Sequence, residues 1–285
     1  GQAGEKMFLR GLIGGNEEGR GQAKRSSRST AWSDQSVLNA PSPVLRSLVQ
    51  REWTLFLRTP IWVLNGLLPA VLVPFIILMP MFTRGEIRGL LAPGQGSLVS
   101  MYIGLGLSGV LIFMGTLNTF ASTSISREGR RFWISRTIPQ SASLQIKAKV
   151  LAALSVSAIA IVPSIAAYAY FAKPEMVNLL MPVLIGVFGT SAGLLFGLRM
   201  DIARPMLRWD DPQEPVKRNL NAIVPMVVPF GFGAVGAWSV ALMVKAGWQP
   251  GSIYSVLLAL TVAAALGLWL NLLRAADGAY RRIED

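Results

Sequence analysis

Long uncharged stretches alternate with polar segments along the chain. Each of six stretches is 22 to 25 residues long and lacks Asp, Glu, Lys and Arg. About 20 apolar residues cross a bilayer as an α-helix, and a helix satisfies its backbone hydrogen-bonding groups internally. The pattern therefore predicts an all-α, polytopic membrane protein with six transmembrane helices. The predicted spans are residues 61–82, 98–122, 150–172, 176–198, 222–244 and 252–273.

Lys and Arg residues lie mainly on one side of these spans. The N-terminal segment, the loops after the second and fourth spans and the C-terminal tail (274–285) hold 23 of them, whereas the other three loops hold 4. Cytoplasmic loops of membrane proteins carry an excess of basic residues. Both termini and the two long loops, 123–149 and 199–221, are therefore predicted to be cytoplasmic.

Composition narrows the possible functions further. The chain is 52% hydrophobic and 15% charged, has a net charge of +12, and contains neither Cys nor His. Without His and Cys there is no imidazole or thiolate zinc site and no Ser-His-Asp or Cys-His nucleophile. We expect no metal and no cofactor. Because the basic residues follow the loops, the charge is interpreted as a topology signal with attraction to anionic lipid, and not as a nucleic-acid footprint.

The segment before the first span has two parts. Residues 1–42 are predicted to be a flexible basic cytoplasmic segment, since 14–42 are rich in Gly, Ser, Arg and Lys without a hydrophobic period. A lipid-binding arm is the alternative. The chain begins at Gly1 with no signal peptide, so we expect a fragment of a longer protein or a processed chain.

Residues 43–59 are predicted to form an amphipathic connecting helix in the membrane interface. Pro43 suits the start of a helix, and Pro60 breaks it from the first span, so that the six-helix transmembrane domain covers residues 60–273. The apolar positions recur at helical spacing and are Leu45, Val49, Trp53 and Phe56.

The loop 123–149 combines aromatic and basic side chains. A short helix here would present Phe132, Trp133 and Ile134 inside a ring of arginines that includes Arg127 and Arg131. Two interpretations stay open: a knob that docks in a groove on a soluble partner, and an anchor in the headgroups. Pro139 ends the short helix, and Ser141 is expected to cap a helix that continues into the third span.

Two further features bear on chemistry. Asp210, Asp211 and Glu214 in the loop 199–221 are compatible with a metal site, but beside so many basic residues a salt-bridged loop is favoured. The spans carry no ionisable group, which disfavours ion-coupled carriers and membrane-embedded hydrolases. The fourth span has a row of small residues for close helix packing, at Gly189, Gly193 and Gly197.

The order of a basic amphipathic helix, six spans and a large basic loop resembles the ABC-2 type permease, the membrane subunit of ATP-binding-cassette exporters. SREGRRFWISRTIP at 126–139 is similar to the loop after the second span of that family, and LVQREWTLFLRTP at 48–60 is similar to its connecting helix. The loop 199–221 resembles that of a subgroup of large bacterial ABC permeases. The resemblance covers about residues 43–273.

The resemblance implies a bacterial inner-membrane permease that exports a substrate. It implies that the region 126–138 is the coupling helix that docks on an ATPase subunit, with Arg127, Glu128, Gly129, Phe132 and Pro139 in that role. The residue pattern adds Arg131 and Trp133. The chain lacks a G-x-x-x-x-G-K-[ST] loop, so the ATPase is expected in a partner chain and this chain is not itself an enzyme.

A second permease half or a homodimer partner is also expected, with membrane lipid around both. Two alternatives stand beside this interpretation. The chain is a non-transport scaffold or assembly subunit, or, less favoured, a membrane-embedded lipid-modifying enzyme with its site around Asp210, Asp211 and Glu214.

Overall fold

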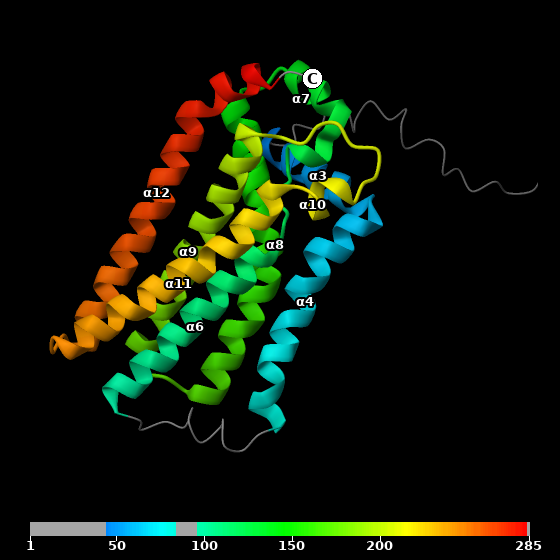
Figure 1. The fold of residues 1–285 in the computed structure, drawn as a ribbon. Helices are drawn as coiled ribbons and strands as arrows, with labels where there is room; N and C mark the ends of the chain where they lie inside the picture. The colour runs from blue at the N-terminus through cyan, green and yellow to red at the C-terminus, as the bar shows by residue number, and fades with distance from the viewer. Residues whose placement is uncertain (1–43, 84–95, 284–285) are drawn as a thin grey trace, which may run out of the picture. The chain divides into compact units, whose positions relative to one another are not determined.

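All regular structure in the described residues is helical (Figure 1). The computed structural model describes residues 44–83 and 96–283, so the predicted segment 1–42 lies outside the described residues. The long helices are α3 (Val44–Leu57), α4 (Pro60–Thr83), α6 (Ser97–Leu117), α8 (Ala142–Ala172), α9 (Met176–Ala203), α11 (Leu220–Lys245) and α12 (Pro250–Arg282). The short ones are η1 (Ser126–Arg131), α7 (Phe132–Thr137) and α10 (Glu214–Lys217).

The predicted membrane fold is confirmed. Within residues 44–83 and 96–283, five helical segments are long and apolar enough to cross a bilayer: Ser97–Leu117, Ala142–Ala172, Met176–Ala203, Glu214–Lys245 and Pro250–Arg282. The segments Val44–Leu57 and Pro60–Leu72 pass the same test together, although they are bent by 104° at the break between them, so the described residues contain five or six candidate spans. The chain is a multi-pass membrane protein.

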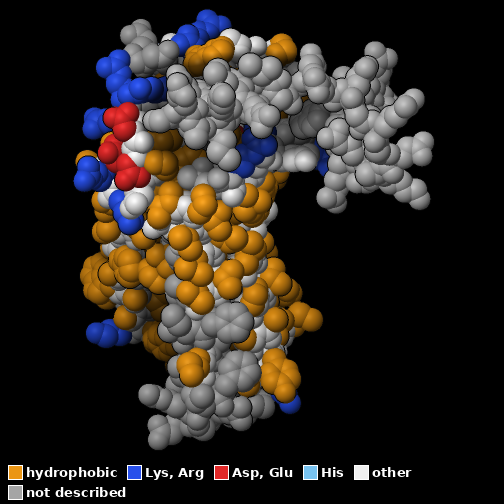
Figure 2. All heavy atoms as spheres, turned by 90° about the vertical axis from the view of Figure 1, so that its right-hand side faces the viewer, with side chains coloured by type: hydrophobic (Ala, Val, Ile, Leu, Met, Phe, Trp, Pro, Cys, Tyr) orange, Lys and Arg blue, Asp and Glu red, His pale blue; other side chains and the backbone are white. Residues whose placement is uncertain are grey.

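Charged side chains gather at one end of the helices. This end carries α3, η1, α7, α10 and the C-terminal end of α12 (Figure 1), and is called the charged end below. Figure 2 shows one face on which hydrophobic side chains cover the middle, whereas most of the Lys, Arg, Asp and Glu side chains lie at the charged end. The arrangement follows from the sequence, because a side chain that carries charge is costly in hydrocarbon.

The central helices are α6, α8 and α9. Helix α9 packs along both α6 and α12, and α8 packs on α3, α4 and α6. Small residues bring α9 close to α6 and the turn that follows it. A Cβ on Gly189 would lie 2.5 Å from Ile112 Cδ1, one on Gly197 would lie 3.0 Å from Ser122 Cβ, and one on Gly193 would overlap Thr116.

The second span is shorter than predicted. Helix α6 ends at Leu117, five residues before the expected end at 122. Asn118 explains the early end, because its Nδ2 donates to the Gly115 carbonyl at 2.6 Å and to Ser157 Oγ at 2.8 Å. Its Oδ1 accepts from the Phe120 backbone N–H at 3.3 Å. These bonds replace the next turn of the helix and direct the uncharged residues that follow into a buried turn.

The third span begins as predicted and extends beyond its apolar part. Ser141 is the N-cap of α8, and its Oγ accepts from the Leu144 backbone N–H at 3.3 Å. Helix α8 then runs through Lys147 and Lys149 into the apolar stretch. Hydropathy marks only the part of a helix that lies in hydrocarbon, so the helix itself is longer.

Candidate functional site

The chain between α6 and α7 folds back into the charged end. Every residue from Asn118 to Gly129 is buried, although the segment contains Arg127 and Glu128. Gly129 has a φ of 54°, in the left-handed region that favours glycine, and a Cβ there would lie 2.8 Å from the ring of Trp209. The segment is therefore a packed structural element that carries α7 at its end.

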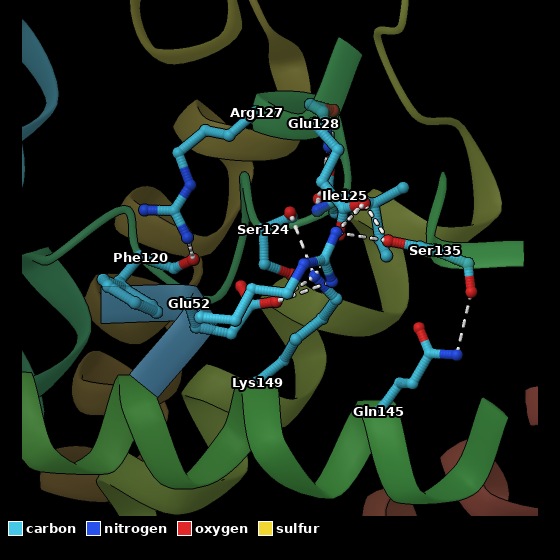
Figure 3. Close-up of polar contacts among 12 residues, drawn as sticks. Glu52, Phe120, Ser124, Ile125, Arg127, Glu128, Ser135, Gln145 and Lys149 are labelled. Atoms are coloured by element: carbon cyan, nitrogen blue, oxygen red, sulfur yellow. Dashed lines mark hydrogen bonds and ion pairs between the residues drawn. The ribbon is translucent and has the colours of Figure 1, made fainter. Parts of the chain in front are cut away.

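Lys149 is the centre of a buried charge network. Its Nζ lies 2.6 Å from Glu128 Oε1 and 2.8 Å from Glu52 Oε1, and its side chain is 1% exposed. Figure 3 shows Lys149 reaching from α8 toward both carboxylates, which come from η1 and from α3. The Nζ also lies 3.4 Å from the Ser124 carbonyl oxygen. One ammonium group thus joins three separate segments of the chain.

A second cation and a hydroxyl complete the network. Arg51 Nη2 lies 3.3 Å from Glu128 Oε2 and donates to Ser135 Oγ at 2.8 Å. Ser135 Oγ donates in turn to Glu128 Oε2, and the Ser135 carbonyl accepts from Gln145 Nε2 at 2.9 Å. Two cations and two carboxylates balance one another, which is the condition for keeping charge in a buried site.

The protonation of Glu128 follows from these contacts. Burial would raise its pKa, but the charges of Lys149 and Arg51, with the hydrogen bonds from Lys149 and Ser135, outweigh burial and hold the pKa below its ordinary value of 4.5. Glu128 is therefore a carboxylate at neutral pH, and the network is ionic.

Arg127 points the other way, into the bend between α3 and α4. Its guanidinium carbon lies 4.1 Å from the ring centroid of Phe120, 5.2 Å from that of Phe56 and 5.8 Å from that of Trp62. Nη2 donates to the Phe120 carbonyl at 3.0 Å, while Nη1 has no hydrogen-bond partner among the described residues. Burial lowers the pKa of Arg127 to about 10, so it stays charged at neutral pH and is held by cation–π contacts.

Asp201 anchors the start of η1 from the end of α9. Its Oδ2 accepts from the backbone N–H of Ile125 at 2.7 Å and of Ser126 at 3.1 Å, and its Oδ1 accepts from the Ser126 hydroxyl. The same hydroxyl oxygen accepts from the Met206 backbone N–H at 2.9 Å and from Asn219 Nδ2 at 3.1 Å. Ser126 therefore joins the 118–131 segment to both ends of the loop after α9.

Two tryptophans fasten that loop to the site: Trp209 of the loop itself and Trp62 of α4. Trp209 Nε1 donates to the Ser126 carbonyl at 2.8 Å, and Trp62 Nε1 donates to the Pro212 carbonyl at 2.7 Å. At the surface Arg130 pairs with Asp210 at 3.1 Å. In the part of the chain that the structure describes, Asp210, Asp211 and Glu214 do not form a group placed to hold a metal ion.

The aromatic residues of α7 divide between the two sides of the helix. Phe132 is completely buried, and its ring lies 5.4 Å from that of Tyr280 on α12. The prediction that Phe132 projects outward is wrong, because the helix turns this residue onto α12. Trp133 is 54% exposed and Ile134 is 39% exposed, so these two form the outward apolar pair. Arg131 and Pro139 are also exposed.

The inward face of the connecting helix includes the predicted Phe56 but otherwise consists of different residues. Leu48, Glu52 and Phe56 are buried, whereas the predicted positions Leu45, Val49 and Trp53 are only partly buried. Trp53 Nε1 donates to Ser155 Oγ on α8 at 3.0 Å, so it packs on the neighbouring helix.

Sequence reasoning missed the residues that hold the site together. Glu52, Lys149 and Asp201 are buried polar partners that were not among the predicted site residues. One signal was present for Glu52, because it stands at positions i+4 and i−4 from the apolar Leu48 and Phe56 and therefore on the inward face of α3. Lys149 and Asp201 lie just outside uncharged stretches, where charge is common.

Comparison with models of protein families, with curated proteins and with solved structures found no match. Lys149, Glu52, Glu128 and Arg51 are paired with one another, and these pairs join α3, η1 and α8. These contacts attach α7 and the segment before it to α3, α8 and α9, with Trp133 and Ile134 on the outer side of α7.

Proposed function

We propose that the chain is the membrane-spanning permease subunit of an ABC exporter of the ABC-2 type, and that a separate ATPase docks on α7. In this proposal the charged end is cytoplasmic, in the inner membrane of a bacterium. The fold is compatible with this role, since a permease needs several spanning helices and a cytoplasmic element that a motor protein can move.

The observation that carries the proposal is the attachment of α7. Its outward pair, Trp133 and Ile134, belongs to a helix whose base is tied to α3 and α8 through Lys149 and to α9 through Asp201. A headgroup anchor would not require these buried ion pairs. A docking element that transmits force does require such attachments, because a force on Trp133 must reach several helices at once.

The energetics of coupling point in the same direction. A ligand shifts a conformational equilibrium only through its different affinities for the two states. An ATPase that closes on ATP can provide that difference if its contact is rigidly joined to the spans. The buried network around Glu128 provides such a joint, whereas a flexible loop would absorb the motion.

The experiment is a tagged purification from native membranes in mild detergent, with mass spectrometry and ATPase assays of the eluate. We expect a P-loop ATPase to accompany the wild-type chain and to be lost in Trp133→Ala. The matched control is Trp248→Ala, which changes a tryptophan that is 44% exposed in the α11–α12 turn, away from the charged end (Figure 1).

Three results would contradict the proposal or refine it. Purification of a folded wild-type chain without any ATPase would contradict it and favour a scaffold. Equal recovery of the ATPase with both tryptophan variants would exclude α7 as the docking element. Loss of an enzymatic activity on lipid after alanine replacement of Asp210, Asp211 and Glu214 would favour the enzyme alternative.

A further inference from the structure

We propose that the surface that receives the ATPase is composite, formed by α7 together with the C-terminal end of α12, and that it fits an apolar pocket bordered by carboxylates. This inference rests on the proposed function and adds the chemistry of the partner surface. The docking face is defined here as Arg131, Trp133, Ile134, Arg136, Arg281 and Arg282, all of which are exposed.

The two parts of the docking face are joined to each other. The buried ring of Phe132 packs against Tyr280 at 5.4 Å between centroids. Arg136 Nη1 donates to the carbonyl oxygen of Ile283, the C-cap of α12, at 3.4 Å. Figure 1 shows α7 and this end of α12 beside one another at the charged end. A partner that covers Trp133 therefore meets the end of α12 as part of the same surface.

The height of α7 above the membrane favours a protein partner over lipid. Tyr280, which contacts Phe132, is seven residues beyond the uncharged stretch that ends at 273. At about 1.5 Å per residue this is about 10 Å along the helix. On α8, Gln145 bonds to Ser135 from five residues outside the stretch that begins at 150, which is about 7 Å. The headgroup layer is about 5 to 8 Å thick on each side, so α7 stands at its outer limit.

The charge of the docking face defines the partner. Four exposed arginines belong to the docking face with Trp133 and Ile134, and Arg130 is left out because it is paired with Asp210. On the last two turns of α12 the acidic residue among those described is Asp277, and Glu284 and Asp285 lie outside the described residues. Carboxylates around a partner pocket would compensate the arginines, steer the encounter and make it sensitive to salt.

The test compares two double variants in the purified complex of the chain with its ATPase. Arg281→Gln with Arg282→Gln removes two charges from the α12 part of the docking face and leaves α7 unchanged. The control, Lys217→Gln with Arg218→Gln, removes two exposed charges from α10 and its C-cap at the same end of the molecule. Melting temperatures verify that both variants are folded, and titration between low and high salt measures the dissociation constant of the ATPase.

We expect the α12 variant to weaken ATPase binding by about three- to tenfold at low salt and to reduce its dependence on salt, as removal of rim charges does. The control should change binding by less than about twofold. If binding requires Trp133 but the two double variants behave alike, the composite acidic pocket is wrong and the proposed function stands. If the wild-type chain binds no ATPase, both fail.

Anionic lipid is the competing explanation of the arginines, and the same variants decide it. The melting temperature is measured in detergent with and without added phosphatidylglycerol. If the α12 variant retains the ATPase but loses the stabilisation by this lipid, the face contacts lipid and the proposal is overturned. If the lipid stabilises all variants equally while ATPase binding falls in the α12 variant, the proposal is supported.

Discussion

Lys149 Nζ lies 2.6 Å from Oε1 of Glu128, and both side chains are almost completely buried. The same ammonium contacts Glu52 at 2.8 Å, so one cation on α8 holds two carboxylates from η1 and α3. Without it, two buried carboxylates would share a single cation, Arg51. The attachment of α7 therefore includes Glu52 on α3, a residue that is remote from α7 in the sequence.

Replacing Lys149 with Met keeps an unbranched side chain and removes its charge. We expect the free energy of unfolding to fall by about 3 to 5 kcal/mol, because removal of one partner leaves buried charges uncompensated. Thermal unfolding in detergent, followed by tryptophan fluorescence, measures the loss. Adding Glu52→Gln and Glu128→Gln should restore part of it, and the exposed pair provides a control in Arg130→Gln, which should leave the melting temperature unchanged. A stable Lys149→Met variant would show that the network does not hold the site.

Alanine replacement of the neighbours Phe132 and Trp133 should affect the stability of the protein very differently. Phe132→Ala empties a fully buried position against Tyr280 and should cost about 3 to 5 kcal/mol of stability. Trp133→Ala removes a side chain that is 54% exposed and should leave stability close to wild type. Melting temperatures of the two variants check this. Equal destabilisation would mean that Trp133 is also part of the core, and a double alanine variant would then confuse docking with folding.

Gly129 should not tolerate a side chain. Gly129→Ala places a Cβ at a φ of 54° and 2.8 Å from the Trp209 ring, so we expect a loss of about 1 to 3 kcal/mol together with a shift of tryptophan emission. Gly236→Ala is the matched control, because a Cβ there meets nothing within 4 Å and the residue lies inside α11. The control should be neutral or slightly stabilising. If both variants melt alike, the turn at Gly129 is not constrained.

Asp201 should protect the amide groups that begin η1. Asp201→Asn keeps the size of the side chain but weakens its bonds to the Ile125 and Ser126 N–H groups and loses an acceptor for the Ser126 hydroxyl. We expect faster hydrogen exchange in the 118–131 segment while α6 and α9 keep their protection, with a loss of about 1 to 3 kcal/mol. Hydrogen exchange with mass spectrometry resolves the segments. Unchanged exchange in 118–131 would remove Asp201 from this role.

Glu128 predicts how stability changes with pH. Its pKa is held below 4.5 in the folded protein, so folding is favoured by the ionised form. This contribution is fully present above the pKa of the unfolded chain and is lost as the pH falls through the lower folded value. We expect stability from this source to hold down to about pH 5 and to decline in more acidic solution. Glu128→Gln should lose less stability than wild type between neutral and acidic pH, while Glu214→Gln, which changes a partly exposed carboxylate outside the network, should follow the wild-type profile. Parallel profiles for all three would contradict the assignment.

The sequence by itself determined the class of the protein and the position of most spans. A helix that crosses the hydrocarbon core of a bilayer needs about 20 apolar residues, and charged side chains are costly there. The uncharged stretches therefore identify the spanning helices without knowledge of how they pack. Local chemistry was equally readable at Ser141, whose cap on α8 depends only on residues a few positions away. The basic loops likewise indicated one charged end.

Only the tertiary structure decided what the charged end does with those residues. Glu52 and Lys149 are 97 residues apart, and whether they meet depends on how α3 packs against α8. The sequence predicted that Phe132 is exposed, whereas in the structure it packs against α12. Hydropathy extended the second span to 122, whereas Asn118 ends the helix at Leu117. Periodicity reports which residues avoid water, but a buried ion pair or a buried turn arises from partners that folding brings together, and its residues resemble ordinary loop residues in the sequence.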